Sequence, residues 1–70
     1  MTKFTINGKE KAFDKDNLPK TLADLLDHLG IHHATVVAEI NGQIIKRNNF
    51  AETKISPSQS IELVKFVGGG

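Results

Sequence analysis

Apolar and polar residues alternate at the start of the chain, which is the pattern of a β-strand with one buried face. Phe4 and Ile6 fall on the same side of this strand. The pair Asn7-Gly8 follows directly, and Asn-Gly tolerates the positive φ angles that a two-residue type I′ turn requires. The pattern therefore predicts a β-hairpin that returns through residues 9–13.

A helical period follows in the next segment. Thr21 is a suitable N-cap, Asp24 places negative charge in the first turn, and Gly30 suits the left-handed residue that ends a helix. Between them, four leucines at i, i+3, i+4 and i+7 form one apolar stripe: Leu22, Leu25, Leu26 and Leu29. These signals predict one amphipathic helix.

A second hairpin is predicted after the helix. Its first strand alternates Val36, Ala38 and Ile40 with Val37 and Glu39. The turn signal repeats at residues 41–42, again Asn-Gly, before a short strand at residues 43–46. Residues 48–60 read as an irregular excursion with a buried aromatic side chain at position 50 and a turn at residues 56–59.

The last predicted strand, residues 61–67, is apolar on both faces. Ile61 and Leu63 point one way, and Val64 and Phe66 point the other. Such a strand is central in its sheet, or one of its faces meets a partner. We expect Ile61 and Leu63 to face the helix and Val64 and Phe66 to form a partner-docking surface; partial cover by residues 48–60 is the alternative.

The order of elements indicates an α+β fold. One helix can cover only one face of a sheet, and the first and last strands form the natural central pair, which is parallel because the rest of the chain supplies the crossover. This is the β-grasp, or ubiquitin-like, arrangement: a mixed sheet of four to five strands with one main helix, in a single domain over residues 1–70. The helix leucines are expected to pack on Phe4, Ile6, Ile40, Ile61 and Leu63.

Composition narrows the function classes. The 70 residues include no cysteine, so disulfides, thiolate nucleophiles and Cys-based zinc sites are excluded. A net charge of +1 with mixed signs gives no support to nucleic-acid binding. No apolar run approaches the roughly 20 residues of a membrane span, and the start lacks the apolar core of a signal peptide. We expect a cytoplasmic protein without membrane or nucleic-acid partners.

The sequence offers no plausible active site. His28, His32 and His33 are the only cluster with metal-ligand residue types, but Gly30 interrupts their helical spacing. We interpret His28 as favouring the negative end of the helix dipole and the other two as residues of a solvated loop. The pairs of aspartates read as solvated surface charges. No catalytic residue and no metal site are predicted, and the chain is not expected to be an enzyme.

The C-terminal run Gly68-Gly69-Gly70 is the strongest functional signal. A frayed terminus is the ordinary reading of such a run. Here, however, it follows Val67 at the end of a predicted core strand, so the glycines form an arm whose starting point is held in place by the sheet. Glycine has no Cβ, and such an arm can thread a narrow channel that would reject side chains.

Over nearly its whole length the chain resembles the ThiS family of thiamine-biosynthesis sulfur carriers. The resemblance rests on the order and spacing of these runs, with Arg47 and Phe50 between the last two: Phe4-Thr5-Ile6-Asn7-Gly8, Thr21-Leu22-Ala23-Asp24-Leu25-Leu26, Ala38-Glu39-Ile40-Asn41-Gly42, Ile44-Ile45, and Ile61 through Gly70. Lys46 stands where the family often has proline, and Ser58-Gln59-Ser60 lacks its usual Gly-Asp. Both departures lie in turns and bear on loop geometry.

The resemblance implies a chemistry for Gly70. Its carboxylate would be adenylated by an E1-like, ThiF-like adenylyltransferase with ATP and Mg²⁺, then converted to a thiocarboxylate that donates sulfur to a ThiG-like thiazole synthase. Gly68 and Gly69 would form the arm, with Val64, Phe66 and Val67 contacting the partner. The chain itself would bind no cofactor, and the sulfur donor stays open. So do three alternatives: a molybdopterin-synthase small subunit, a ubiquitin-like protein modifier, and a plain β-grasp interaction module.

Overall fold

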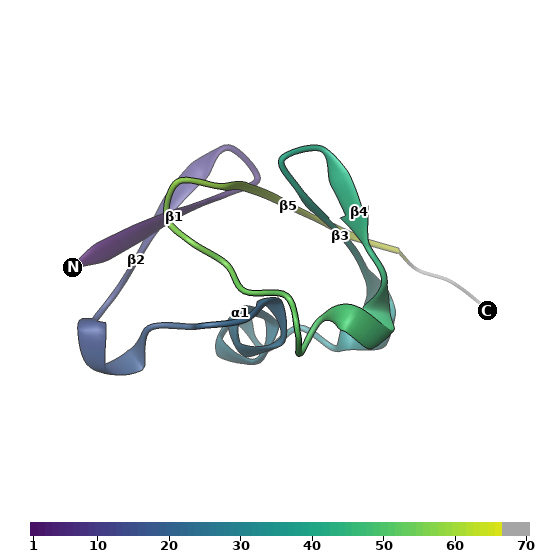
Figure 1. The fold of residues 1–70 in the computed structure, drawn as a ribbon, viewed down its shortest axis with the longest axis horizontal. Helices are drawn as coiled ribbons and strands as arrows, with labels where there is room; N and C mark the ends of the chain where they lie inside the picture. The colour runs from purple at the N-terminus through teal and green to yellow at the C-terminus, as the bar shows by residue number, and fades with distance from the viewer. Residues whose placement is uncertain (67–70) are drawn as a thin grey trace.

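The computed structural model describes residues 1–66, which form a five-stranded mixed sheet with one α-helix across one face (Figure 1). The strand order is β2-β1-β5-β3-β4, and the central strands β1 and β5 run parallel. The β-grasp arrangement predicted from the sequence is therefore confirmed. The elements are β1 (Thr2–Ile6), β2 (Lys9–Phe13), α1 (Leu22–Leu29), β3 (Val36–Ile40), β4 (Gln43–Ile45) and β5 (Ser60–Lys65), with short 3₁₀ turns η1 (Lys15–Asn17), η2 (His33–Thr35) and η3 (Arg47–Asn49).

Both predicted Asn-Gly turns have the expected backbone. Asn7 and Asn41 each have a φ of 53°, and the following glycines Gly8 and Gly42 have φ values of 77° and 82°. These positive values suit the type I′ turn, in which asparagine and glycine are the favoured residues. The turns set the registers of β1 against β2 and of β3 against β4.

The side chains of both turn asparagines also hold β5. Asn7 donates from Nδ2 to the Leu63 carbonyl (3.1 Å) and accepts at Oδ1 from the Leu63 N–H (2.7 Å). Asn41 accepts one such bond, from the N–H of Ser60 (2.9 Å). The two hairpins are thus fastened to the central strand by side chains where the backbone ladders end.

We expect Asn7→Ala to lower the free energy of unfolding by about 1–3 kcal/mol, since two hydrogen bonds to a part-buried backbone are lost and alanine disfavours the positive φ. Urea denaturation measures this loss. Asn41→Ala is the matched control, because it has the same φ and one side-chain bond fewer. Equal losses in the two variants would mean that the second bond to Leu63 contributes nothing.

The helix begins and ends as its sequence predicts. Thr21 and Asp24 form a capping box: Thr21 Oγ1 accepts from the Asp24 N–H (3.1 Å), and Asp24 Oδ2 accepts from the N–H of Thr21 (3.2 Å). The backbone N–H groups of Lys20 and Thr21 stabilise the charged carboxylate and lower the pKa of Asp24. At the other end, Gly30 takes the left-handed conformation with a φ of 70°.

The excursion over residues 48–60 runs across the start of α1. The Leu22 N–H donates to the Thr53 carbonyl (2.9 Å), and the Ala23 N–H donates to the Phe50 carbonyl (3.1 Å). These are two of the N–H groups that the first turn of a helix leaves without a partner inside the helix. Phe50 is buried beneath the loop, as predicted. The loop therefore completes the helix start.

Both departures from the family pattern are accommodated by ordinary backbone geometry. Lys46 has a φ of −70°, the value to which a proline ring would restrict it. The turn at residues 56–59 closes without a Gly-Asp pair, because the Gln59 N–H donates to the Ser56 carbonyl (3.2 Å) and Gln59 Oε1 accepts from the Ser56 N–H (2.8 Å).

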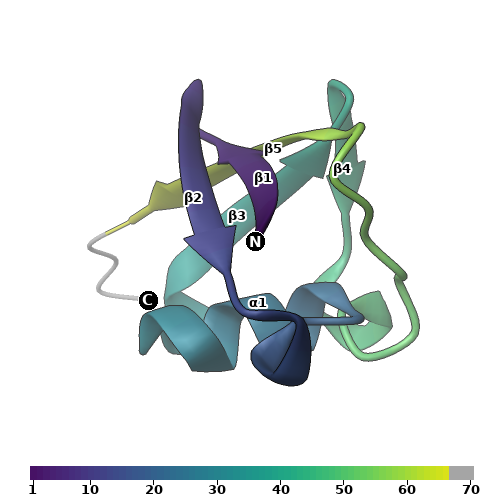
Figure 2. The same ribbon diagram turned by 90° about the vertical axis from the view of Figure 1, so that its left-hand side faces the viewer.

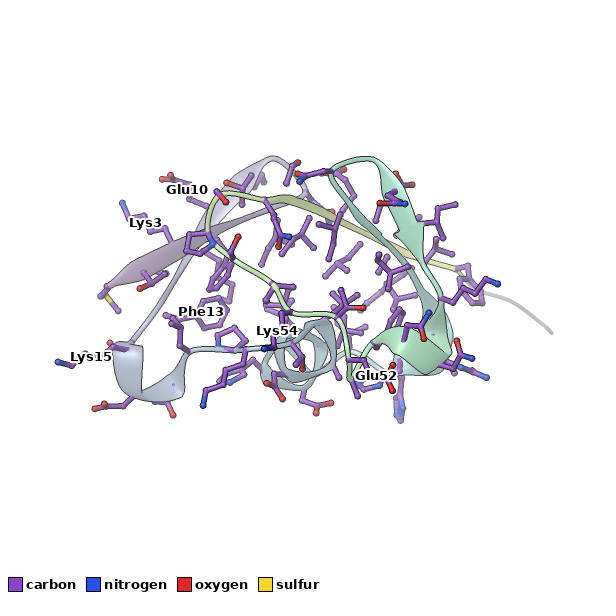
Figure 3. The ribbon with its side chains drawn as sticks, in the orientation of Figure 1. Lys3, Glu10, Phe13, Lys15, Glu52 and Lys54 are labelled. Carbon is purple, nitrogen blue, oxygen red and sulfur yellow. The ribbon has the colours of Figure 1, made fainter. Side chains whose placement is uncertain are left out.

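The core lies between α1 and the sheet, where Figure 3 shows the Phe13 side chain directed inward and Lys3 and Lys15 at the periphery. Of the predicted core residues, Leu29 and Ile6 are only partly buried. The fully buried large side chains are Phe4, Phe50, Leu22, Leu25, Leu26 and Ile61. No helix within residues 1–66 is long and apolar enough to cross a membrane.

Candidate functional site

The described part of β5 ends at the approach to the glycine run. The Phe66 N–H donates to the carbonyl of Thr35 (3.0 Å), so the pairing of β5 with β3 continues one residue past the strand proper. Phe66 therefore lies in a fixed position on the sheet. The remaining predicted site residues, Val67, Gly68, Gly69 and Gly70, lie outside the described residues.

The face of the sheet opposite α1 carries exposed apolar side chains beside this point. Val64 is 56% exposed and Phe66 is 48% exposed, on the face where the sequence placed them. The alternative that residues 48–60 cover this pair is wrong, because that loop runs over the start of α1 instead. Their part in partner binding stays a prediction.

Two further apolar side chains join this surface. Val37 lies directly opposite Val64 in the ladder between β3 and β5, so their side chains are neighbours. Ile44 on β4 is 65% exposed and lines one groove together with Val37 and Phe66. We name Val37, Ile44, Val64 and Phe66 the open-face patch. Sequence reasoning missed Val37 and Ile44.

Charged groups border the patch on two sides. Arg47 lines the same groove and is exposed. Further along the open face Glu39 and Glu62 lie directly opposite each other in the ladder. The patch thus lies between Arg47, which lines the groove with Phe66, and an acidic pair toward the hairpin turns. Figure 2 shows the end of β5 from the side of β2.

The three histidines are not gathered into one site. His28 and Phe13 form a T-shaped pair of rings, with ring centroids 5.6 Å apart. His33 Nε2 lies 2.9 Å from Asp27 Oδ1, and its ring packs against that of Phe50. His33 keeps 35% of its side-chain surface exposed in the short segment between α1 and β3, as the predicted loop implies, and its contact with Asp27 joins the helix end to η2. Within residues 1–66 no three His, Asp or Glu side chains are grouped to hold a metal ion.

The described surface therefore suits docking: an apolar patch with a charged border at the point where the chain approaches its glycines. Aromatic side chains are enriched at the centre of protein interfaces, and Phe66 is the aromatic member of the patch. Exposed apolar side chains in one contiguous patch mark interaction sites on small proteins.

Comparisons with known proteins identify the family of the chain. Residues 4–70 match the profile of the ThiS family. The sulfur carrier protein ThiS of Bacillus subtilis is 35% identical over 65 residues, covering 93% of this chain and 96% of the relative. A crystal structure of the thiamine biosynthesis protein ThiS from Geobacter metallireducens superposes with a TM-score of 0.79 at 30% identity, covering 99% of this chain and 100% of that one.

A third relative is larger. The thiazole synthase of Paramagnetospirillum magneticum is 32% identical over 68 residues, which cover 97% of this chain but only 20% of the synthase. The family match, the nearly full-length carrier relative and the shared fold together settle the classification. The chain belongs to the ThiS family, the sulfur carrier proteins of thiamine biosynthesis.

Proposed function

We propose that the α-carboxylate of Gly70 is the sulfur-carrying group of this protein, at the end of an arm formed by Gly68 and Gly69. The family supports the role of carrier. The observation that supports this location is the open-face patch, two of whose members, Val64 and Phe66, lie on the segment that precedes the glycines in the chain. A partner that docks on the patch receives the arm at the same time.

The proposed chemistry is activation followed by displacement. A carboxylate is ionised at neutral pH and resists nucleophiles, so it needs a leaving group. One carboxylate oxygen attacks the α-phosphorus of ATP, and pyrophosphate leaves. A hydrosulfide ion supplied by the donor then attacks the acyl carbon of the adenylate, AMP leaves, and loss of the sulfur-bound proton gives the thiocarboxylate. ATP and Mg²⁺ are held by an E1-like, ThiF-like adenylyltransferase; this chain is its substrate, and we place the step in the cytoplasm.

A ThiG-like thiazole synthase is the proposed acceptor of the sulfur. The thiazole synthase of Paramagnetospirillum magneticum supports this pairing, because a segment similar to this chain makes up 20% of its length. Joining of two activities in one polypeptide is expected where a carrier delivers its cargo directly to the enzyme.

The test is intact mass spectrometry of the chain after incubation with the adenylyltransferase, ATP, Mg²⁺ and a sulfur source. The mass should rise by the difference between a sulfur and an oxygen atom, localised by fragmentation to Gly70. An unchanged mass, or isopeptide adducts on protein lysines in place of the thiocarboxylate, would refute the proposal.

We expect Phe66→Ala to weaken binding to the adenylyltransferase about tenfold or more, since truncating a hot-spot aromatic side chain costs about 2 kcal/mol or more. Binding is measured by titration calorimetry. Phe66 is 48% exposed, so the melting temperature should change little.

Lys3→Ala is the control for Phe66→Ala. Lys3 lies near the start of β1, at the end of the molecule away from the patch (Figure 3), and should bind as the parent does. If Phe66→Ala unfolds the protein instead, Phe66 belongs to the core and the docking proposal fails.

A further inference from the structure

The backbone of β5 pairs alternately with its two neighbours. In an antiparallel ladder every second residue exchanges hydrogen bonds with its partner strand, and the residues between turn their N–H and C=O groups the other way. The bond from the Phe66 N–H to Thr35 shows that Phe66 faces β3. Ile61, Leu63 and Lys65 therefore face the opposite edge of β5, the edge that β1 occupies.

That edge is filled only in part. The Ile61 carbonyl accepts a hydrogen bond from the Asn7 N–H (2.8 Å). Both backbone groups of Leu63 are taken by the Asn7 side chain. At this point β1 has turned into the first hairpin, and β5 continues beside β3 alone (Figure 1). The register therefore leaves the N–H and C=O of Lys65 without a partner among residues 1–66.

The open position at Lys65 lies one residue from the open-face patch and leads toward the glycines. Glycine offers a partner no side chain, so an enzyme can recognise a glycine arm only through its backbone N–H and C=O groups. Adding a strand to an open sheet edge is the general way in which proteins bind an extended backbone. The structure presents such an edge at the start of the arm.

We propose that the adenylyltransferase adds a β-strand to the edge of β5 at Lys65, on the side opposite β3. The inference rests on the proposed function and adds to it how the enzyme aligns the arm. Lys65 precedes Gly70 by five residues, about 16–18 Å of extended chain. Pairing at Lys65 fixes the direction of that arm, and with it the position of the carboxylate.

A second copy of this chain is a poorer occupant of the edge. Pairing of two copies at this one open position would form only two hydrogen bonds, and each contributes little net free energy. The long outer edge, β2, carries Lys9, Glu10 and Lys11, whose charges oppose pairing between copies. An enzyme strand that continues along the arm gains further bonds that a second copy does not.

Amide hydrogen exchange followed by NMR tests the proposal directly. In the free protein the Lys65 amide should exchange fast, whereas the Phe66 amide, bonded to Thr35, should exchange slowly. With saturating adenylyltransferase the Lys65 amide should slow by about tenfold or more, the factor that one hydrogen bond of ordinary net strength supplies. Slowing that depends on carrier concentration without enzyme would assign the edge to a second copy and overturn the proposal.

A semisynthetic chain provides the second test. Replacing Lys65 by its α-hydroxy acid exchanges the peptide N–H for an ester oxygen and keeps the side chain. The matched control is the same replacement at Ala12, whose N–H faces the outer edge of β2 because Ile6 and Lys9 are the bonded pair that closes the hairpin. The Lys65 ester should be adenylated about tenfold more slowly than the parent, and the Ala12 ester at the parent rate.

The outcomes separate the two claims. If the parent is thiocarboxylated, yet the Lys65 amide stays unprotected in the complex and the Lys65 ester reacts as the parent does, strand addition is refuted and the proposed function stands. If the parent accepts no sulfur at all, the proposed function fails and strand addition fails with it.

Discussion

Leu25→Ala is expected to destabilise the protein by about 2–5 kcal/mol, the usual cost of truncating a buried leucine. Leu25 has no exposed surface and lies on the helix face that meets the sheet. A domain of 70 residues has roughly 4–10 kcal/mol of stability in total, so the loss is a large share of it. In thermal unfolding followed by circular dichroism, the melting temperature should fall by about 8 °C or more.

Leu29→Ala is the matched control for this prediction. Leu29 belongs to the same stripe but is only partly buried, because it lies in the last turn of α1. Its truncation leaves a smaller cavity and should cost clearly less. An unchanged melt for Leu25→Ala would show that the helix stripe does not form the core.

The elements that could be predicted from the sequence are those that local chemistry determines. The Asn7-Gly8 turn follows from the few residues that accept positive φ angles, and the ends of α1 follow from Thr21 and Gly30. The parallel pairing of β1 with β5 follows from connectivity, since only a long crossover can join parallel neighbours.

The features that escaped prediction depend on contacts between distant parts of the chain. The path of residues 48–60 is determined by the unpaired N–H groups at the start of α1, which no local pattern in the loop reveals. His33 contacts Asp27, six residues earlier, because the left-handed Gly30 ends the helix and changes the direction of the chain. Such partners become visible only when the fold is known.

Two of the four residues of the open-face patch were predicted from the sequence. Val64 and Phe66 were recognised because their strand is apolar at both parities, and the structure shows both exposed. Val37 and Ile44 carry the same signal, since each lies beside an apolar neighbour of the other parity, Val36 and Ile45. With one helix covering one face, every such pair places one apolar side chain on the open face. Applied to all strands, this argument would have found the whole patch.

Deleting Gly70 is expected to slow thiocarboxylate formation at least about a hundredfold. The deletion moves the carboxylate back along the arm by about 3.3–3.6 Å, the length of one extended residue. A displacement near 1 Å from the position of attack can already cost about a hundredfold in rate. Rates are measured by intact mass over time, with the adenylyltransferase, ATP, Mg²⁺ and sulfur source present in excess.

Adding an alanine after Gly70 tests reach and channel width together, because it displaces the carboxylate in the other direction and places a methyl group where the arm has only glycine. Among the described residues the buried core extends from Phe4 to Leu63. We expect both tail variants to melt as the parent does. They should also still bind the adenylyltransferase through the open-face patch. Loss of sulfur acceptance with binding retained would therefore assign the defect to the position of the carboxylate. Thiocarboxylation of either variant at the parent rate would show that Gly70 is not the group on which the enzyme acts.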